Sequence, residues 1–129
     1  MKAIELLVGR ILLAQIFILA GIDKLGAGYS GTQAYMESMG VPGALLPVVI
    51  ALEIAGGLAL AAGFITRYAA WALAAFTVVA GVLFHANFSD QMQTILFMKN
   101  MAMAGGLLVL AAAGAGALSL DHKLNSKEA

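Results

Sequence analysis

The sequence contains no cysteine, so disulfide bonds, CxxC redox motifs, thiolate nucleophiles and iron–sulfur clusters are excluded for this chain on its own. Charge is scarce as well, because Asp, Glu, Lys and Arg make up only 11% of the 129 residues. Seven basic and seven acidic residues give a formal net charge of zero, which leaves no basic surface for the phosphates of a nucleic acid. Nucleic-acid binding is therefore excluded, and any redox role needs a group from outside the chain.

The residues that are abundant are hydrophobic: they make up 62% of the chain, and the mean hydropathy is +0.95. A hydrocarbon core about 30 Å thick is crossed by about 20 apolar residues. Four such runs occur, at about 4–22, 44–64, 68–86 and 99–118. They are too long, and too rich in Ala, Leu and Gly, to be the strands of a barrel. We therefore predict one all-α domain over 1–129, an integral membrane four-helix bundle in the lipid bilayer.

The connection between the first two spans is long enough to hold an element of its own. Residues Thr32–Met39 have the pattern of a short amphipathic helix, with Thr32 as its N-cap and Gly40 directly after its end. We expect this helix in the first outer loop, with three side chains on the membrane surface: Tyr35, Met36 and Met39. The other outer connection, Asn87–Phe97, is polar at its start and is predicted to be a lip or partial loop.

The distribution of basic residues predicts the orientation. Lys and Arg gather in cytoplasmic segments, and an even number of spans places both termini on one side. The terminus side collects four such residues and the other side two: Lys2, Arg67, Lys123 and Lys127 against Lys24 and Lys99. We predict a multi-pass protein of the plasma (inner) membrane with cytoplasmic N and C termini. Because Arg10 and Gln15 interrupt the first run, we expect that span to be retained rather than cleaved as a signal peptide.

Glu53 is the most costly charge in this arrangement. It follows Gly43 by ten residues, which puts it about 15 Å into the second span and near the bilayer midplane. A lone carboxylate there costs several kcal/mol and needs a partner or a wet cavity. The long side chain of Arg10 can reach the same depth from the first span, so we predict an Arg10–Glu53 ion pair. Such a pair either fixes helix register or tunes a binding site, and both interpretations stay open.

Polar side chains from three spans meet at the predicted outer rim. His85 ends the third span, and Lys99 and Asn100 open the fourth. Imidazole suits proton transfer near neutral pH, and all three side chains can donate hydrogen bonds to the oxygens of a small molecule. A purely interfacial hydrogen-bonding role is the alternative for His85. Lys24, at the end of the first span, is expected to extend toward water.

A metal centre is not expected within one chain. The two histidines, His85 and His122, fall on opposite sides of the predicted membrane, so they cannot form a two-histidine haem site or a histidine-rich zinc site. A homo-oligomer would be needed to bring two copies of His85 together. No phosphate loop, nucleophile elbow or metalloprotease helix is present, so the motifs identify no catalytic residue and no intrinsic cofactor.

Several segments, taken together, are similar to those of one family. They are Gly9-Arg10 to Ala20-Gly21 with Lys24, Gly31-Thr32-x-x-Tyr35-Met36-x-x-x-Gly40-Val41-Pro42, Glu53 with Gly56-Gly57, Gly63-Phe64-x-Thr66-Arg67, Phe84-His85, Lys99-Asn100 and Gly114-x-Gly116-x-x-Ser119-Leu120-Asp121. Over essentially its whole length the chain resembles the DoxX family of small inner-membrane proteins. The resemblance implies a four-helix plasma-membrane protein related to the membrane subunits of thiosulfate:quinone oxidoreductase and other membrane redox assemblies.

Two functional hypotheses follow. In the first, the bundle binds a quinone-like or other small lipophilic molecule through His85, Lys99 and Asn100, with Glu53 and Arg10 below, as a component of a membrane redox system that carries no electrons itself. Four side chains would wall this pocket: Phe84, Phe88, Phe97 and Met103. In the second, the chain is a non-catalytic membrane scaffold or assembly partner, in which the charges set topology and helix register and the outer loop contacts another protein. Solute transport is a third option, which would need a homo-oligomer because four short helices enclose little volume.

Overall fold

The computed structural model describes the backbone of residues 1–128 and the side chains of residues 1–125. The described elements, in order, are α1 (Lys2–Asp23), α2 (Gly28–Ser38), the 3-10 turn η1 (Gly43–Leu45), α3 (Leu46–Ala62), α4 (Thr66–Phe84), α5 (Gln91–Ala113) and α6 (Leu120–Glu128). Four of them are long and apolar enough to cross a membrane: α1, η1 with α3, α4 and α5. The predicted all-α, four-span fold is confirmed.

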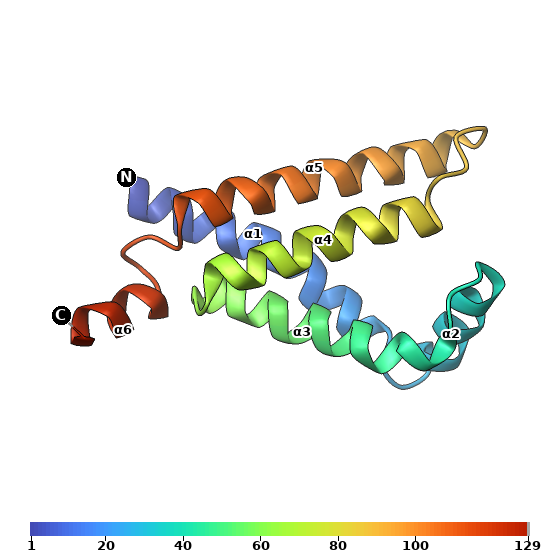
Figure 1. The fold of residues 1–129 in the computed structure, drawn as a ribbon, viewed down its shortest axis with the longest axis horizontal. Helices are drawn as coiled ribbons and strands as arrows, with labels where there is room; N and C mark the ends of the chain where they lie inside the picture. The colour runs from blue at the N-terminus through green and yellow to red at the C-terminus, as the bar shows by residue number, and fades with distance from the viewer. Residues whose placement is uncertain (129) are drawn as a thin grey trace.

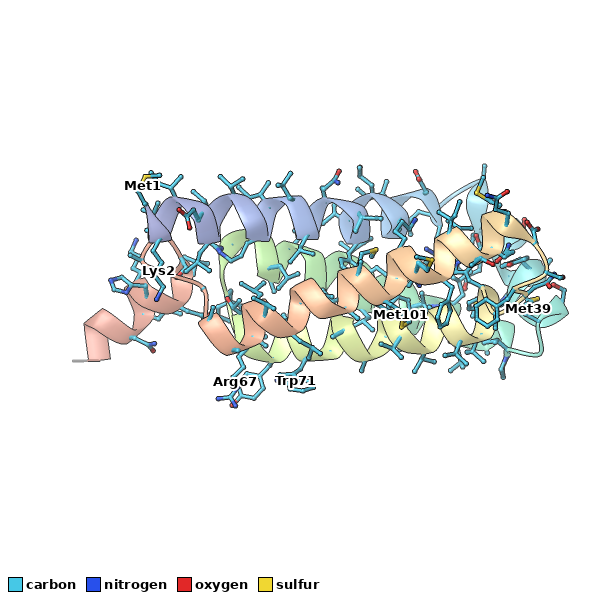
Figure 2. The ribbon with its side chains drawn as sticks, turned by 90° about the horizontal axis from the view of Figure 1, so that it is seen from above. Met1, Lys2, Met39, Arg67, Trp71 and Met101 are labelled. Atoms are coloured by element: carbon cyan, nitrogen blue, oxygen red, sulfur yellow. The ribbon has the colours of Figure 1, made fainter. Side chains whose placement is uncertain are left out.

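The four spans form two antiparallel pairs. Helix α1 packs along α3 and α4 packs along α5, while α3 and α4 join the pairs through a tight turn and α1 touches α5 only locally. Figure 1 shows the pairs diverging toward the end that carries α2, and both termini at the opposite end. We call these the α2 end and the terminus end. Arg67 and Trp71 project outward near the terminus end, whereas Met39 marks the α2 end (Figure 2).

Small residues set how closely the paired helices approach. A Cβ added at Gly57 of α3 would lie 2.7 Å from Cγ1 of Ile18 and 3.2 Å from the carbonyl oxygen of Ala14, both on α1. Only glycine therefore allows this contact between the two helices. The core between the pairs is built from alanine and leucine, including the fully buried Leu60 and Leu73.

Both predicted boundaries of the fourth span need correction. The fourth span starts at Gln91, so the predicted loop at Asn87–Phe97 is wrong from Gln91 onward. The carboxylate of Asp90 caps this helix by accepting from the backbone N–H of Met92 at 2.9 Å, and so the helix extends beyond the apolar run. Its other end is at Ala113 rather than 118, where Gly114 takes a positive φ of 84°.

The short helix of the first outer loop is confirmed, but it is longer than expected. It begins at Gly28, and Thr32 lies inside it rather than at its N-cap, with its hydroxyl donating to the carbonyl of Gly28 at 2.8 Å. Gly40 follows the helix end with a φ of 80°, as predicted. Met36 is buried against Leu46 and not on the membrane surface, so one face of α2 packs on the bundle.

Candidate functional site

Side chains from five helices, α1 to α5, line a cavity of about 450 Å³ at the α2 end. This volume lies within the range of about 300–1,000 Å³ found for small-molecule sites. The wall is largely apolar and includes Ile16, Phe17, Val49, Phe76 and Leu83. Four of the five predicted site residues line it: Glu53, His85, Lys99 and Asn100.

Glu53 is paired with Lys24 and not with Arg10. The ammonium Nζ of Lys24 lies 2.8 Å from Oε1 of Glu53 and also donates to the carbonyl of Ala20 at 3.2 Å. Gly21 explains the contact, because a Cβ there would lie 3.3 Å from the Cβ of Glu53, so the last turn of α1 is level with Glu53. The predicted Arg10–Glu53 pair is therefore wrong, and Lys24 turns inward instead of extending to water.

His85 and Asn100 hold the α4–α5 pair together beside the cavity. Nδ1 of His85, at the C-cap of α4, lies 2.8 Å from Oε1 of Gln93 on α5. Nδ2 of Asn100 donates to the backbone carbonyl of Thr77 at 3.1 Å, and Asn100 is only 9% exposed. Lys99, by contrast, is exposed and lines the cavity without an ion-pair partner among residues 1–125.

The aromatic walls differ in part from the prediction. Phe84 and Met103 line the cavity as expected. Phe88 and Phe97 do not; they pack edge to face on each other, with centroids 5.0 Å apart. Sequence reasoning missed Tyr35, whose ring stacks on Phe84 with centroids 5.5 Å apart and places α2 over the cavity. A tyrosine on the apolar face of the short helix was the available signal.

Arg10, the fifth predicted site residue, belongs to the terminus end. Its side chain is fully buried, and Nη1 donates to the carbonyls of Leu60 and Ala61, each at 3.1 Å, while Nη2 donates to the carbonyl of Leu118. Leu60 and Ala61 lie in the last turn of α3, where carbonyls lack helical partners and the helix dipole favours a cation. Arg10 therefore caps α3 and takes no part in the cavity.

Asp121 makes the matching contact at the start of α4. Its two carboxylate oxygens accept from the backbone N–H groups of Ile65 and Thr66 at 2.7 and 2.9 Å, and its own N–H donates to the carbonyl of Gly63 at 2.8 Å. Gly63 has a φ of 70°, and a Cβ there would lie 2.5 Å from Nη1 of Arg10. The beginning of α6 is thus fastened to the α3–α4 turn.

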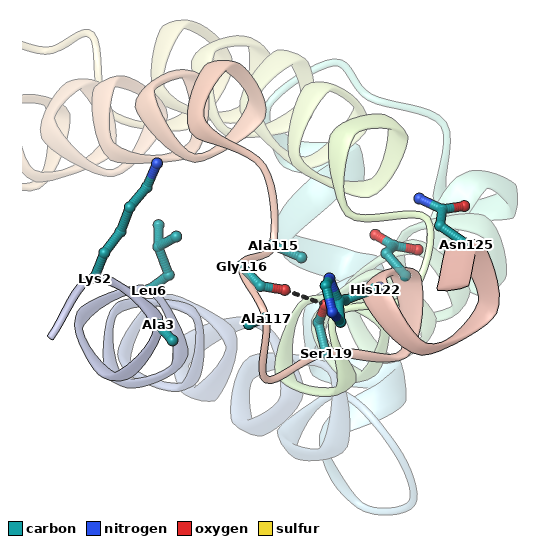
Figure 3. A pocket seen from close by; sticks show the side chains of 10 residues that line it. Lys2, Ala3, Leu6, Ala115, Gly116, Ala117, Ser119, His122 and Asn125 are labelled. Atoms are coloured by element: carbon teal, nitrogen blue, oxygen red, sulfur yellow. Dashed lines mark hydrogen bonds between the residues drawn. The ribbon is translucent and has the colours of Figure 1, made fainter. Parts of the chain in front are cut away.

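A second, more open hollow of about 530 Å³ lies between α1 and α6 at this terminus end (Figure 3). Lys2, Asp121 and His122 line it, and none of the predicted site residues does. The hydroxyl of Ser119 in its wall donates to the carbonyl of Gly116 at 2.6 Å. Among the residues that the structure describes, no three His, Asp or Glu side chains come close enough to hold a metal ion.

The chain is similar to known membrane proteins over most of its length. The DoxX family model matches residues 5–86. The chain is 51% identical over 130 residues to inner membrane protein YqjF of Escherichia coli (strain K12). This match covers 98% of this chain and 99% of that protein. It is 35% identical to inner membrane protein YphA of the same organism, over 95% of this chain and 91% of that protein. No solved structure matches. With its four apolar helices, the chain is a multi-pass member of the DoxX family of integral inner membrane proteins.

Proposed function

We propose that the chain binds a small lipophilic molecule with an oxygen-bearing headgroup, such as a quinone, in the cavity at the α2 end. The observation that carries this proposal is the cavity itself: about 450 Å³ with apolar walls, into which a few polar side chains converge. That combination is typical of small-molecule sites. Phe76, Leu83 and Phe84 offer the flat apolar contact that a ring and its tail need.

The polar side chains supply the second requirement, hydrogen bonds for the headgroup. Oε1 of Glu53 is buried, and its one polar partner in the described part of the chain is the ammonium of Lys24, 2.8 Å away. The amide of Asn100 uses one of its two N–H groups on the carbonyl of Thr77, so the second N–H is available to a ligand. His85 lies at the rim, where its second ring nitrogen can donate to or accept from a headgroup.

The proposed role is to hold and orient the molecule for a membrane redox system. The chain has no cysteine for a cluster or a thiol relay, so in this proposal a redox partner protein carries the electrons. The chain would contribute the apolar cavity and the polar contacts that fix the headgroup. A protein without redox groups can serve a membrane redox system in this way, by binding the quinone and fixing its orientation.

Saturable binding tests the proposal. Protein in nanodiscs is titrated with a short-chain benzoquinone analogue, followed by calorimetry. We expect His85→Ala to weaken binding by about 2- to 10-fold, the value of one hydrogen bond, while His122→Ala, at the terminus end, leaves it unchanged. Ala80→Phe, which fills the cavity, should abolish saturable binding, and Ala75→Phe on the exposed face of the same helix should not.

The titration also separates ligand binding from the scaffold hypothesis. If the wild-type protein shows no saturable binding, or if Ala80→Phe binds as the wild type does, the cavity is not a ligand site. The scaffold role would then be the better explanation, and the variants would be compared for partner assembly in the membrane instead.

We further propose that both termini are cytoplasmic. Lys2, Arg67 and Lys123 lie at the terminus end, and Lys24 and Lys99 lie toward the α2 end, so the excess of basic residues is on the side of the termini. A C-terminal green fluorescent protein fusion should fluoresce, and alkaline phosphatase inserted between α1 and α2 should be active. An active phosphatase at the C-terminus would reverse the orientation.

A further inference from the structure

Lys99 is a cation within the membrane span that no carboxylate of residues 1–125 neutralises. It lies eight residues after the start of α5, which puts it about 12 Å along a helix that is about 34 Å long. Its neighbour Asn100 bonds to the carbonyl of Thr77, and α4 continues about two turns beyond Thr77, to Phe84. Lys99 is therefore level with the interior of α4 and not with the outer ends of the helices.

The remaining charges of the cavity balance without Lys99. Lys24 and Glu53 form an ion pair, so together they contribute no net charge. His85 contacts the neutral side chain of Gln93. Within the described part of the chain, no carboxylate lies within ion-pair distance of Lys99, and Lys99 lines the cavity. Lys99 thus adds one uncompensated positive charge to a cavity whose other charged side chains, Lys24 and Glu53, neutralise each other.

An ionisable side chain in a membrane span that faces a cavity is costly to keep and is usually functional. A counter-charge can come from a ligand when no residue provides it. We propose that the natural ligand is a lipophile with an acidic headgroup, whose negative charge pairs with the ammonium of Lys99. This inference rests on the proposed function and adds the charge of the ligand to it. The Lys24–Glu53 pair, already neutral, would contact the uncharged part of the headgroup.

Two ligand sources share this chemistry: a quinone with an ionised enolic hydroxyl and a fatty acid. Three probes tell them apart: a 2-hydroxy-1,4-naphthoquinone with an alkyl tail, its methyl ether, and dodecanoic acid. The ether keeps the ring and the tail but has lost the acidic proton, so it is the matched neutral control. If both acids bind, an acidic group on an apolar tail is sufficient for binding. If only the naphthoquinone binds, binding requires the ring as well as the acidic group. Either result supports an acidic lipophile.

Binding is measured in nanodiscs with wild-type protein, Lys99→Gln, Lys99→Arg and the control Lys2→Gln. We expect the wild type to bind the acidic naphthoquinone about 10- to 100-fold more tightly than the methyl ether, the value of a charge-assisted contact. Lys99→Gln should remove this preference, because it should weaken the binding of the acid far more than the binding of the ether. Lys99→Arg should keep most of the preference, and Lys2→Gln should keep all of it.

The outcomes distinguish this inference from the proposed function. Equal affinity for the acid and the ether, or an undiminished preference in Lys99→Gln, overturns the acidic-ligand inference while ligand binding itself stands. No saturable binding of any probe to the wild type overturns both. Lys99 is exposed, so the variants should fold, and melting curves alongside the titrations check this.

Discussion

Replacing Arg10 by methionine should destabilise the bundle strongly without touching the cavity. The change keeps an unbranched side chain of similar length but removes the guanidinium that donates to the carbonyls of Leu60, Ala61 and Leu118. The last turn of α3 then loses its cap, and the segment after α5 loses one of its two attachments to the bundle, the other being Asp121. Both effects arise at the terminus end.

The magnitude follows from the three hydrogen bonds of Arg10. Hydrogen bonds to a charged group contribute about 1.5–3 kcal/mol each. Part of this gain is offset in the wild type, because a fully buried guanidinium must first be desolvated. We therefore expect a net loss of about 3 kcal/mol in the free energy of unfolding. For a chain of this size that corresponds to a fall of roughly 10 °C in melting temperature.

The assay is thermal unfolding in one detergent, with the exposed Arg67→Met as the matched control, which should change the melting temperature little. The quinone analogue should still bind Arg10→Met below its melting temperature. A double-mutant cycle with Glu53→Gln should be additive within about 0.5 kcal/mol, because the two residues share no contact. Recovery of the Arg10→Met loss by Glu53→Gln would show that the two side chains do interact and would refute this assignment.

Three further predictions use the same unfolding assay. Lys24→Gln should cost about 1–3 kcal/mol because it leaves Glu53 buried without its partner, and adding Glu53→Gln should recover part of that loss; full additivity would contradict the observed pair. Gly57→Ala should cost about 1–3 kcal/mol by pushing α3 away from α1, whereas Gly105→Ala, with nothing within 4 Å, should be neutral or stabilising; equal effects would refute the close contact. Asp121→Ala should cost about 1–2 kcal/mol by uncapping α4, and an unchanged melting temperature would argue against that cap.

The spans could be predicted because hydrophobicity along the chain is a local property. The apolar runs locate three helices to within a few residues, and Gly40 marks the end of the short helix through its positive φ. The start of α5 could not be found in this way. Three of its first four residues, Gln91–Thr94, are polar, and Lys99 and Asn100 separate the next apolar residues from the long apolar run that begins at Met101. A prediction from the apolar run therefore places the start of the helix too late. The cap at Asp90 was the local signal that could have located it.

Pairing of charges could not be predicted because it depends on how far one helix is shifted along another. Arg10 contacts the last turn of α3, and Gly21 packs on Glu53, so Arg10 is separated from the level of Glu53 by eleven residues of α1, or about 16 Å. That is farther than an arginine side chain reaches. The predicted pair came from the depths of Arg10 and Glu53, each counted from the end of its own span, and this count ignores the shift between the helices. The prediction therefore paired Glu53 with Arg10 instead of Lys24.

The segments that resemble the DoxX family separate into two groups in space. Arg10, Gly63 and Asp121 join the terminus end through backbone hydrogen bonds, so their side chains act on helix ends and not on a ligand. Glu53 and Asn100 instead line the cavity where the helix pairs diverge. The hydrogen bonds at the terminus end fasten the two helix pairs to each other, so the pairs can diverge at the α2 end, where the cavity lies. Substitutions of Arg10, Gly63 and Asp121 should therefore change stability more than ligand selectivity. Substitutions at exposed positions of the cavity should change ligand selectivity more than stability.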